Sequence, residues 1–187
     1  MINQKPLFVD LDGTLIKEDL SNLAFFKMFK KNPIKIFFYL FLFLFFGKAY
    51  LKEKISKKFV VPIHNLHFNS ECIKFIRESY NHHRVIYLIS GSHQCLVEQI
   101  NNHLKLFNEV FGTRNNYNLV GINKVKFINE KLKFNDFDYI GNSKKDIPIW
   151  EYTQKIIYTN ADKCLIKKIN ESKLSKLRVD EKFIQKI

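Results

Sequence analysis

Two acidic side chains stand two residues apart directly after a short apolar run near the start of the chain. Asp10 and Asp12 follow the apolar residues Leu7–Val9, and carboxylates at positions i and i+2 leaving a strand project to the same side. One carboxylate can then act as a nucleophile while the other exchanges protons with the reacting groups. Gly13 permits a sharp turn after the pair, and the Thr14 hydroxyl can tie that turn. The segment predicts a reactive loop at the end of a strand.

The elements that must position these residues are short buried strands separated by helical patterns. Four apolar runs have the length and composition of such strands: Leu7–Val9, Val85–Ile89, Asp138–Ile140 and Ile156–Thr159. Strands that are apolar throughout predict an α/β fold, a Rossmann-like parallel sheet covered by helices on both faces. The first three runs end in polar clusters, and ligands collect where the carboxyl ends of parallel strands meet. We therefore expect one site built from three strand ends.

The polar clusters also carry a family resemblance. Asp10-Leu11-Asp12-Gly13-Thr14-Leu15 resembles the first motif of the haloacid dehalogenase-like (HAD) phosphohydrolases. Ser90-Gly91 resembles the second motif, which offers a hydroxyl and a backbone N–H to a phosphoryl group, and Ser92 is predicted to cap the helix that follows. The segment Gly141–Asp146 resembles the fourth, magnesium-binding motif.

The resemblance implies magnesium-dependent hydrolysis of a phosphomonoester through an aspartyl-phosphate. Asp10 would attack phosphorus, and Asp12 would protonate the leaving oxygen and then activate water. The implied phosphate-binding residues are Thr14, Ser90, Gly91 and Lys124, and the implied Mg²⁺ ligands are Asp10, Asp12, Asn142 and Asp146.

Two positions depart from the family pattern. Asn142 stands where the fourth motif usually has an aspartate, and Val120 stands where the third motif usually has a lysine. Lys124 lies four residues after Val120, on the same face of a helix, and side chains lean toward the helix N-terminus. We expect Lys124 to supply the missing ammonium. The alternative interpretation is a catalytically weakened HAD domain that serves as a binding or scaffolding partner.

The order of the motifs over roughly residues 5–170 resembles the HAD domain often fused ahead of UbiA-type prenyltransferases. This resemblance implies a phosphorylated small molecule or a lipid-linked phosphate as substrate. It also implies a membrane prenyltransferase as a partner. In the alternative interpretation, the weakened HAD domain would bind or scaffold this prenyltransferase.

The segment between the first two motifs has a different character and predicts an inserted helical cap. We expect the HAD core to comprise residues 1–15 and 82–187, and the cap residues 16–81. Nine of the 19 phenylalanines fall within Phe25–Phe46, and Ile36–Phe46 is apolar throughout. Between residues 27 and 58 the chain carries nine lysines and one acidic residue, Glu53.

Three interpretations of the apolar run stay open. It could be a buried helix with a solvated lysine rim, or a surface that dips into an anionic membrane leaflet, as interfacial anchors do. A membrane span is disfavoured, because eleven helical residues cover only about 16 Å of a roughly 30 Å hydrocarbon layer.

Composition limits the class of protein. The chain has 187 residues and a formal charge of +13, which favours phosphorylated ligands or an anionic surface. Nucleic acid is disfavoured as a partner because the lysines are spread along the chain and no recognition module is present. Three widely spaced cysteines and the lack of a secretory signal favour a cytoplasmic protein, peripheral on the inner face of the membrane if the cap meets lipid. The tail, residues 163–187, is predicted to be a helix.

Overall fold

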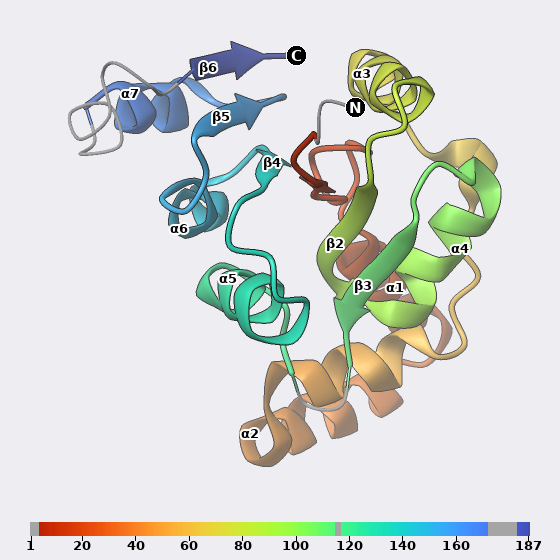
Figure 1. The fold of residues 1–187 in the computed structure, drawn as a ribbon. Coiled ribbons are helices and arrows are strands. Elements are labelled where there is room, and N and C mark those ends of the chain that lie inside the picture. Colours follow the sequence, from red (N-terminus) through yellow and green to blue (C-terminus); the bar gives the residue numbers. More distant parts are fainter. Residues whose placement is uncertain (1–3, 115–116, 172–182) are drawn as a thin grey trace.

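A six-stranded, all-parallel sheet forms the centre of the computed structural model, which describes residues 4–114, 117–171 and 183–187 (Figure 1). The strand order is β3-β2-β1-β4-β5-β6. The strands are β1 (Leu7–Val9), β2 (Ile86–His93), β3 (Glu109–Thr113), β4 (Asp138–Gly141), β5 (Lys155–Tyr158) and β6 (Phe183–Lys186). All five strand pairs are parallel, which confirms the predicted fold class.

Helices cover both faces of this sheet. They are α1 (Leu20–Lys31), α2 (Pro33–Ser56), α3 (Ser70–Asn81), α4 (Gln94–Leu104), α5 (Ile122–Lys126), α6 (Ile147–Trp150) and α7 (Lys163–Glu171), with short helical turns at Ile63–Asn65, Phe127–Lys131 and Lys144–Asp146. Leu7 and Val9 of β1 pack in one apolar cluster with α1, α3 and α4. Phe8 between them packs in a second cluster with α5, α6 and α7. This alternation gives the sheet two buried faces, and helices lie on both sides of it in Figure 1.

All four predicted strands are present. β4 and β5 differ from the prediction by no more than one residue at either end, whereas β2 runs four residues past its predicted end, Ile89, to His93. Two further strands were not predicted. β3 was missed, and β6 contradicts the prediction of a helix over residues 163–187. That prediction is confirmed for α7 and wrong for Phe183–Lys186, which pairs with Lys155–Tyr158 of β5. A segment of four residues becomes a strand here because its backbone pairs with the free edge of β5. The remainder of the predicted helix, residues 172–182, lies outside the described residues.

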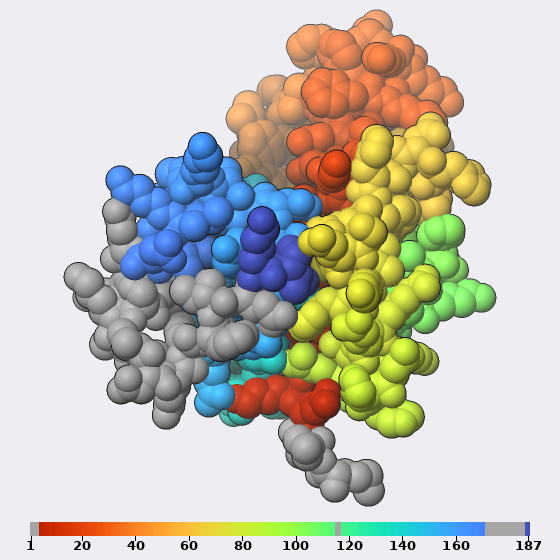
Figure 2. All heavy atoms as spheres, turned by 90° about the horizontal axis from the view of Figure 1, so that it is seen from above, coloured from red at the N-terminus to blue at the C-terminus, as the bar shows by residue number. Residues whose placement is uncertain are grey.

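The α1–α2 pair forms a hairpin that protrudes from one end of the molecule (Figure 2). The Asp19 carboxylate caps α1 by accepting from Asn22 N–H, and Asn32 caps α2 with Pro33 at its first position, both favourable ways to start a helix. Gly47 interrupts α2 with φ 76° and ψ −177°, a conformation that essentially only glycine adopts. The helix therefore changes direction at this residue.

The apolar run Ile36–Phe46 is not a buried helix, so that interpretation is wrong. In α2 only Ile36, Ala49, Ile55 and Ser56 are buried, while Phe37 and Phe45 are 65% and 69% exposed. The division into core and cap at residues 15 and 82 stays a prediction. Within the predicted cap, α3 packs Cys72 and Ile76 into the same cluster as the strands.

Candidate active site

Asp10 lies at the carboxyl end of β1, in the middle of the sheet. Its backbone N–H donates to the Ile140 carbonyl of β4 at 3.0 Å, and its side chain is largely buried. The Lys124 ammonium donates to Asp10 Oδ1 at 2.6 Å, although Lys124 belongs to α5 and is itself only 3% exposed. The structure thus brings together the two residues that the sequence analysis assigned to a nucleophile and a counter-charge.

A chain of hydrogen bonds continues from Lys124 to Asp146. Lys124 Nζ donates to the Tyr139 hydroxyl at 2.8 Å, and that hydroxyl donates to Asp146 Oδ1 at 2.7 Å. Asp146 Oδ2 accepts from the backbone N–H groups of Asn142 and Ser143 at 3.1 and 2.9 Å. Asp146 therefore fixes the loop after β4. Burial is the main reason why the pKa of Tyr139 lies well above its ordinary value.

Thr14, Asn142 and Gly13 line the edge of the site beside Asp10. The Thr14 hydroxyl lies 3.4 Å from Asp10 Oδ2 and 3.3 Å from Asn142 Oδ1. Gly13 has φ +80°, and a Cβ atom there would lie 2.2 Å from Asn142 Nδ2. A side chain at position 13 would therefore clash with Asn142, so only glycine allows this approach.

Asp12 turns toward the start of α1 and the end of β2. Its Oδ1 accepts from the Leu20 backbone N–H, and its Oδ2 accepts from the hydroxyls of Ser90 and Ser92, all at 2.8 Å. The predicted capping role of Ser92 is wrong, because His93 caps α4 and the Ser92 side chain serves Asp12. Ser90 and Asp12 are direct neighbours, as a shared site requires.

The two aspartates have altered acidity. Burial raises the pKa of Asp10 to about 7, because the attraction of Lys124 offsets it only in part and the charges of Asp146 and Asp12 add to it. Burial also raises the pKa of Asp12, and the nearby charge of Asp19 raises it further. The hydrogen bonds that Asp12 accepts lower this pKa and offset the rise in part. Carboxyls that hold a proton closer to neutral pH suit proton transfer and mark candidate active sites.

Lys52, from the second half of α2, is a site residue that the sequence analysis did not identify. Its ammonium donates to the Gly91 carbonyl at 2.6 Å and to Asn118 Oδ1 at 2.8 Å. The Gly91 carbonyl also accepts from the Thr113 hydroxyl at 2.8 Å. Burial lowers the pKa of Lys52 to about 8. One lysine among the nine between residues 27 and 58 gives no sequence signal of this contact, which depends on how α2 folds back. The sequence analysis also did not identify Tyr139 as a site residue, because an aromatic residue within an apolar strand is typical of the core.

The side-chain oxygens near Asp10 are hard donors of the kind that Mg²⁺ takes. In the described ranges no three His, Cys, Asp or Glu side chains gather into a metal-holding group. Asp10 Oδ2 and Asn142 Oδ1 share only the long contacts to Thr14, and oxygen donors of this kind suit Mg²⁺. Two of the predicted ligands, Asp10 and Asn142, therefore present oxygens that fit Mg²⁺ in kind.

Comparison with known sequences gives one informative relative. No family model matches the chain. The uncharacterized protein y4nM of Sinorhizobium fredii is 32% identical over 146 residues, which is 78% of this chain. The chain spans 28% of the length of that protein.

Comparison with solved structures identifies the fold. A HAD family hydrolase from Salmonella enterica serovar Typhi is similar with a TM-score of 0.59 and 13% identity, over 88% of this chain and 66% of that chain. A substrate-bound phosphoserine phosphatase has a TM-score of 0.57 and 15% identity, over 90% and 91%. A phospho-aspartyl intermediate analogue of phosphoserine phosphatase has a TM-score of 0.53 and 14% identity, over 89% and 91%. The structural neighbours are thus HAD-family hydrolases, and the chain has their fold.

Proposed function

We propose that the protein is a phosphomonoester hydrolase that acts through an aspartyl-phosphate on Asp10. The observation that carries the proposal is the 2.6 Å contact between Asp10 and the buried Lys124 ammonium at the carboxyl end of β1, with Asp12 two residues away. The fold shared with phosphoserine phosphatase, one of whose structures holds a phospho-aspartyl intermediate analogue, supports the same chemistry.

The proposed reaction has two steps. An Asp10 carboxylate oxygen attacks phosphorus while the bond from phosphorus to the ester oxygen breaks, and Asp12 gives its proton to the leaving alcohol. Asp12 then takes a proton from water, whose oxygen attacks phosphorus and releases inorganic phosphate and free Asp10. The raised pKa of Asp12 supports its role as the acid of the first step.

Thr14, Ser90, Gly91 and Lys124 are the proposed phosphate-binding residues. Lys124 neutralises charge beside Asp10, and its ammonium is held by Tyr139 as well. The Ser90 hydroxyl now donates to Asp12, so it would exchange that partner for a phosphoryl oxygen. In phosphoryl transfer the protein mainly positions groups and neutralises charge.

Mg²⁺ is the proposed cofactor. Asp10, the Asp12 carbonyl, Asn142 and Asp146 would hold it, and the bound ion would neutralise phosphoryl charge. Both Asp146 oxygens now accept hydrogen bonds within the protein. Asp146 would have to exchange one of those bonds to reach the ion directly.

The proposed substrate is a phosphorylated small molecule or a lipid-linked phosphate near a membrane, and the proposed setting is the cytoplasmic face of that membrane. The resemblance to domains fused ahead of UbiA-type prenyltransferases supports a lipid phosphate, and so does the exposed apolar hairpin of the cap. A second candidate function is a weakened domain that binds or scaffolds a membrane prenyltransferase. Asn142 favours this candidate because it would bring no charge to the metal. Val120 does not favour it, because the Lys124 ammonium beside Asp10 replaces the lysine that is missing at position 120.

A phosphatase assay separates the two candidates. The protein is incubated with p-nitrophenyl phosphate, with and without magnesium, beside the variant Asp10→Asn. We expect hydrolysis that requires magnesium and falls by at least roughly ten-thousandfold in the variant, the scale seen when a nucleophile is removed. The amide is isosteric, so circular dichroism should show an unchanged fold. Hydrolysis that survives in Asp10→Asn would refute the mechanism, and no hydrolysis by the native protein would favour the scaffold.

A further inference from the structure

The first half of α2 carries a series of strongly exposed apolar side chains. Ile34, Phe37, Phe38, Phe41, Leu44 and Phe45 are each between 57% and 81% exposed, and we call these six the apolar patch. The patch protrudes from the body of the protein (Figure 2), and α1 extends it, since Phe29 lies 6.4 Å from Phe37 between ring centroids. Contiguous exposed apolar surface of this kind marks an interaction site.

The shape of α2 favours partial insertion into a membrane over a span. By length and composition α2 is long and apolar enough to cross a membrane, with a mean hydropathy of 1.8 over a window that is 11% buried. Gly47, however, breaks the helix, and the residues before it, 33–46, cover only about 21 Å. The half after Gly47 returns to the core, where Lys52 binds the Gly91 carbonyl. A helix of this length is too short to cross a hydrocarbon layer of roughly 30 Å and is long enough to enter it from one side.

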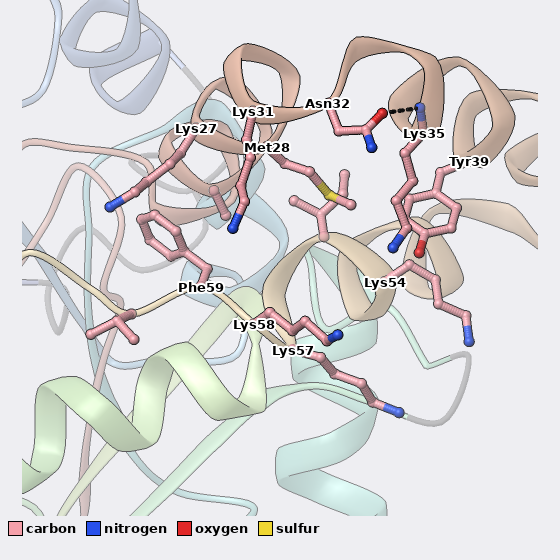
Figure 3. A pocket seen from close by; sticks show the side chains of 13 residues that line it. Lys27, Met28, Lys31, Asn32, Lys35, Tyr39, Lys54, Lys57, Lys58 and Phe59 are labelled. Carbon is pink, nitrogen blue, oxygen red and sulfur yellow. Dashed lines mark hydrogen bonds between the residues drawn. The ribbon is translucent and has the colours of Figure 1, made fainter.

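A groove of about 580 Å³ opens between α1 and the two halves of α2 (Figure 3). Its apolar lining includes Met28, Ile55 and Phe59. Its lysines are Lys27, Lys31, Lys35, Lys54, Lys57 and Lys58. The volume lies within the usual range of small-ligand sites, roughly 300–1,000 Å³.

The groove concentrates positive charge with little compensation. Lys57 is paired with Glu53 at 2.6 Å, and it is the one groove lysine that has a carboxylate partner within the described part of the chain. The ammonium groups of Lys27 and Lys35 instead lie 5.8 Å from the rings of Phe59 and Tyr39. A basic groove with an apolar lining, beside an apolar surface, complements an anionic amphiphile.

We propose that the α1–α2 hairpin docks on an anionic lipid leaflet. The apolar patch enters the boundary between headgroups and acyl chains, and the groove lysines hold lipid phosphate headgroups. Lysines around an inserted apolar element add electrostatic attraction to anionic lipid. The docking deepens the proposed function and rests on it only for the identity of the substrate. It is measured without catalysis, so its failure and the failure of hydrolysis are distinguishable.

Vesicle flotation tests the docking. The whole protein is mixed with vesicles of phosphatidylcholine and phosphatidylglycerol, or of phosphatidylcholine alone, and the floating fraction is measured at increasing salt. We expect flotation that requires the anionic lipid and weakens with salt, because salt screens exposed charges. No flotation with either vesicle would overturn the proposal, and so would a stable dimer or a complex with a membrane protein that covers the patch in its place.

Two matched pairs of variants test the groove itself. Lys27→Gln with Lys31→Gln removes two groove lysines, and Lys30→Gln with Lys48→Gln removes two exposed lysines outside the groove lining. Each charge near an anionic surface contributes about fivefold in affinity. We expect the groove pair to lose roughly twenty-five-fold or more and the outer pair clearly less. Equal losses would overturn the headgroup contact.

A third variant, Phe38→Ser with Phe41→Ser and Phe45→Ser, tests insertion. All three side chains are more than half exposed, so the melting temperature should change little while flotation is lost. Flotation that persists in this variant would contradict insertion of the patch. A large fall in the melting temperature would show instead that the patch is covered by protein, which also contradicts the proposal.

Discussion

Lys124 reaches Asp10, but not by the geometry that the sequence predicted. The prediction placed Val120, which stands where the family pattern has lysine, and Lys124 on one face of a helix. In the structure α5 begins at Ile122, and its N-cap Gly121 has φ 54° and ψ −126°, so Val120 lies before the helix and shares no helix face with Lys124. Lys124 nevertheless enters the site. The structure places its ammonium between Asp10 and Tyr139, at 2.6 and 2.8 Å.

Removing this ammonium should disable the site. We expect Lys124→Met to lower phosphatase activity by roughly a hundredfold to a thousandfold, the usual cost of one lost charge-stabilising donor. The control Lys126→Met changes an exposed lysine of the same helix and should leave turnover unchanged. Steady-state rates with p-nitrophenyl phosphate measure both variants. Equal activity in Lys124→Met and the native protein would mean that Lys124 does not serve the reaction.

Asn142 is the second departure at this scale, and it concerns charge. Its Oδ1 lies 3.3 Å from the Thr14 hydroxyl, and an aspartate would place an oxygen there with an added negative charge. We expect Asn142→Asp to tighten magnesium binding about tenfold, because ligand charge raises the affinity for such cations. Titration calorimetry with magnesium in the absence of substrate measures the change. Affinity that is unchanged or weaker would show that Asn142 is not a ligand.

At the scale of elements, the second half of α2 joins the predicted cap to the loops of the candidate site. Its contact is Lys52, which binds the Gly91 carbonyl at the end of β2 and Asn118 after β3. Gly47 makes the contact possible, because without its left-handed backbone the helix would run straight. The cap is thereby tied to the segment proposed to hold phosphate.

This buried lysine predicts a pH-dependent stability. Burial lowers the pKa of Lys52 to about 8 from an ordinary value of 10.5, so the unfolded chain holds the proton more tightly than the folded one. The charged lysine therefore costs stability below pH 8, and the cost disappears as the pH rises toward 10.5. Relative to Lys52→Met, the native protein should gain roughly 1 to 2 kcal/mol of unfolding free energy over this window, after allowance for partial exposure.

Urea unfolding at several pH values between 7 and about 10 measures that difference. The variant Lys35→Met, at an exposed position of the same helix, corrects for the general effect of losing one lysine. A difference between the native protein and Lys52→Met that stays constant with pH would contradict the assigned environment of Lys52.

The elements that the sequence predicted are those whose apolar pattern depends on burial alone. Leu7–Val9 forms the strand that was predicted, because all three residues are buried between two helical layers. β3 and β6 were missed for a different reason. In β3, Glu109 is exposed and Val110 is only partly buried. β6 exists because its backbone pairs with the edge of β5. Both strands depend on pairing with a neighbouring strand, and their own residues give little signal of that pairing.

At the scale of the whole molecule, the sequence located the strand ends that form the site but not the contacts between them. Asp10, Asp12 and Ser90 follow predicted strands, and the parallel topology brings them together. The links through Lys52 and Tyr139 depend on tertiary packing across 39 and 15 residues, for which local pattern holds no signal. The sequence also could not predict the exposure of α2, because an apolar run has the same composition whether it packs against protein or lies on the surface.

The central claim is that Asp10 carries the phosphoryl group, and direct detection of that adduct tests it. Asp12→Asn cannot activate water in the second step, so the adduct should accumulate on its Asp10. This variant is mixed with p-nitrophenyl phosphate and magnesium, quenched in acid, digested and analysed by mass spectrometry. We expect a phosphoryl group on Asp10 in Asp12→Asn and none when Asp10 is also replaced by asparagine. Hydrolysis by the native protein with no adduct in the variant, or an adduct on another residue, would contradict the account.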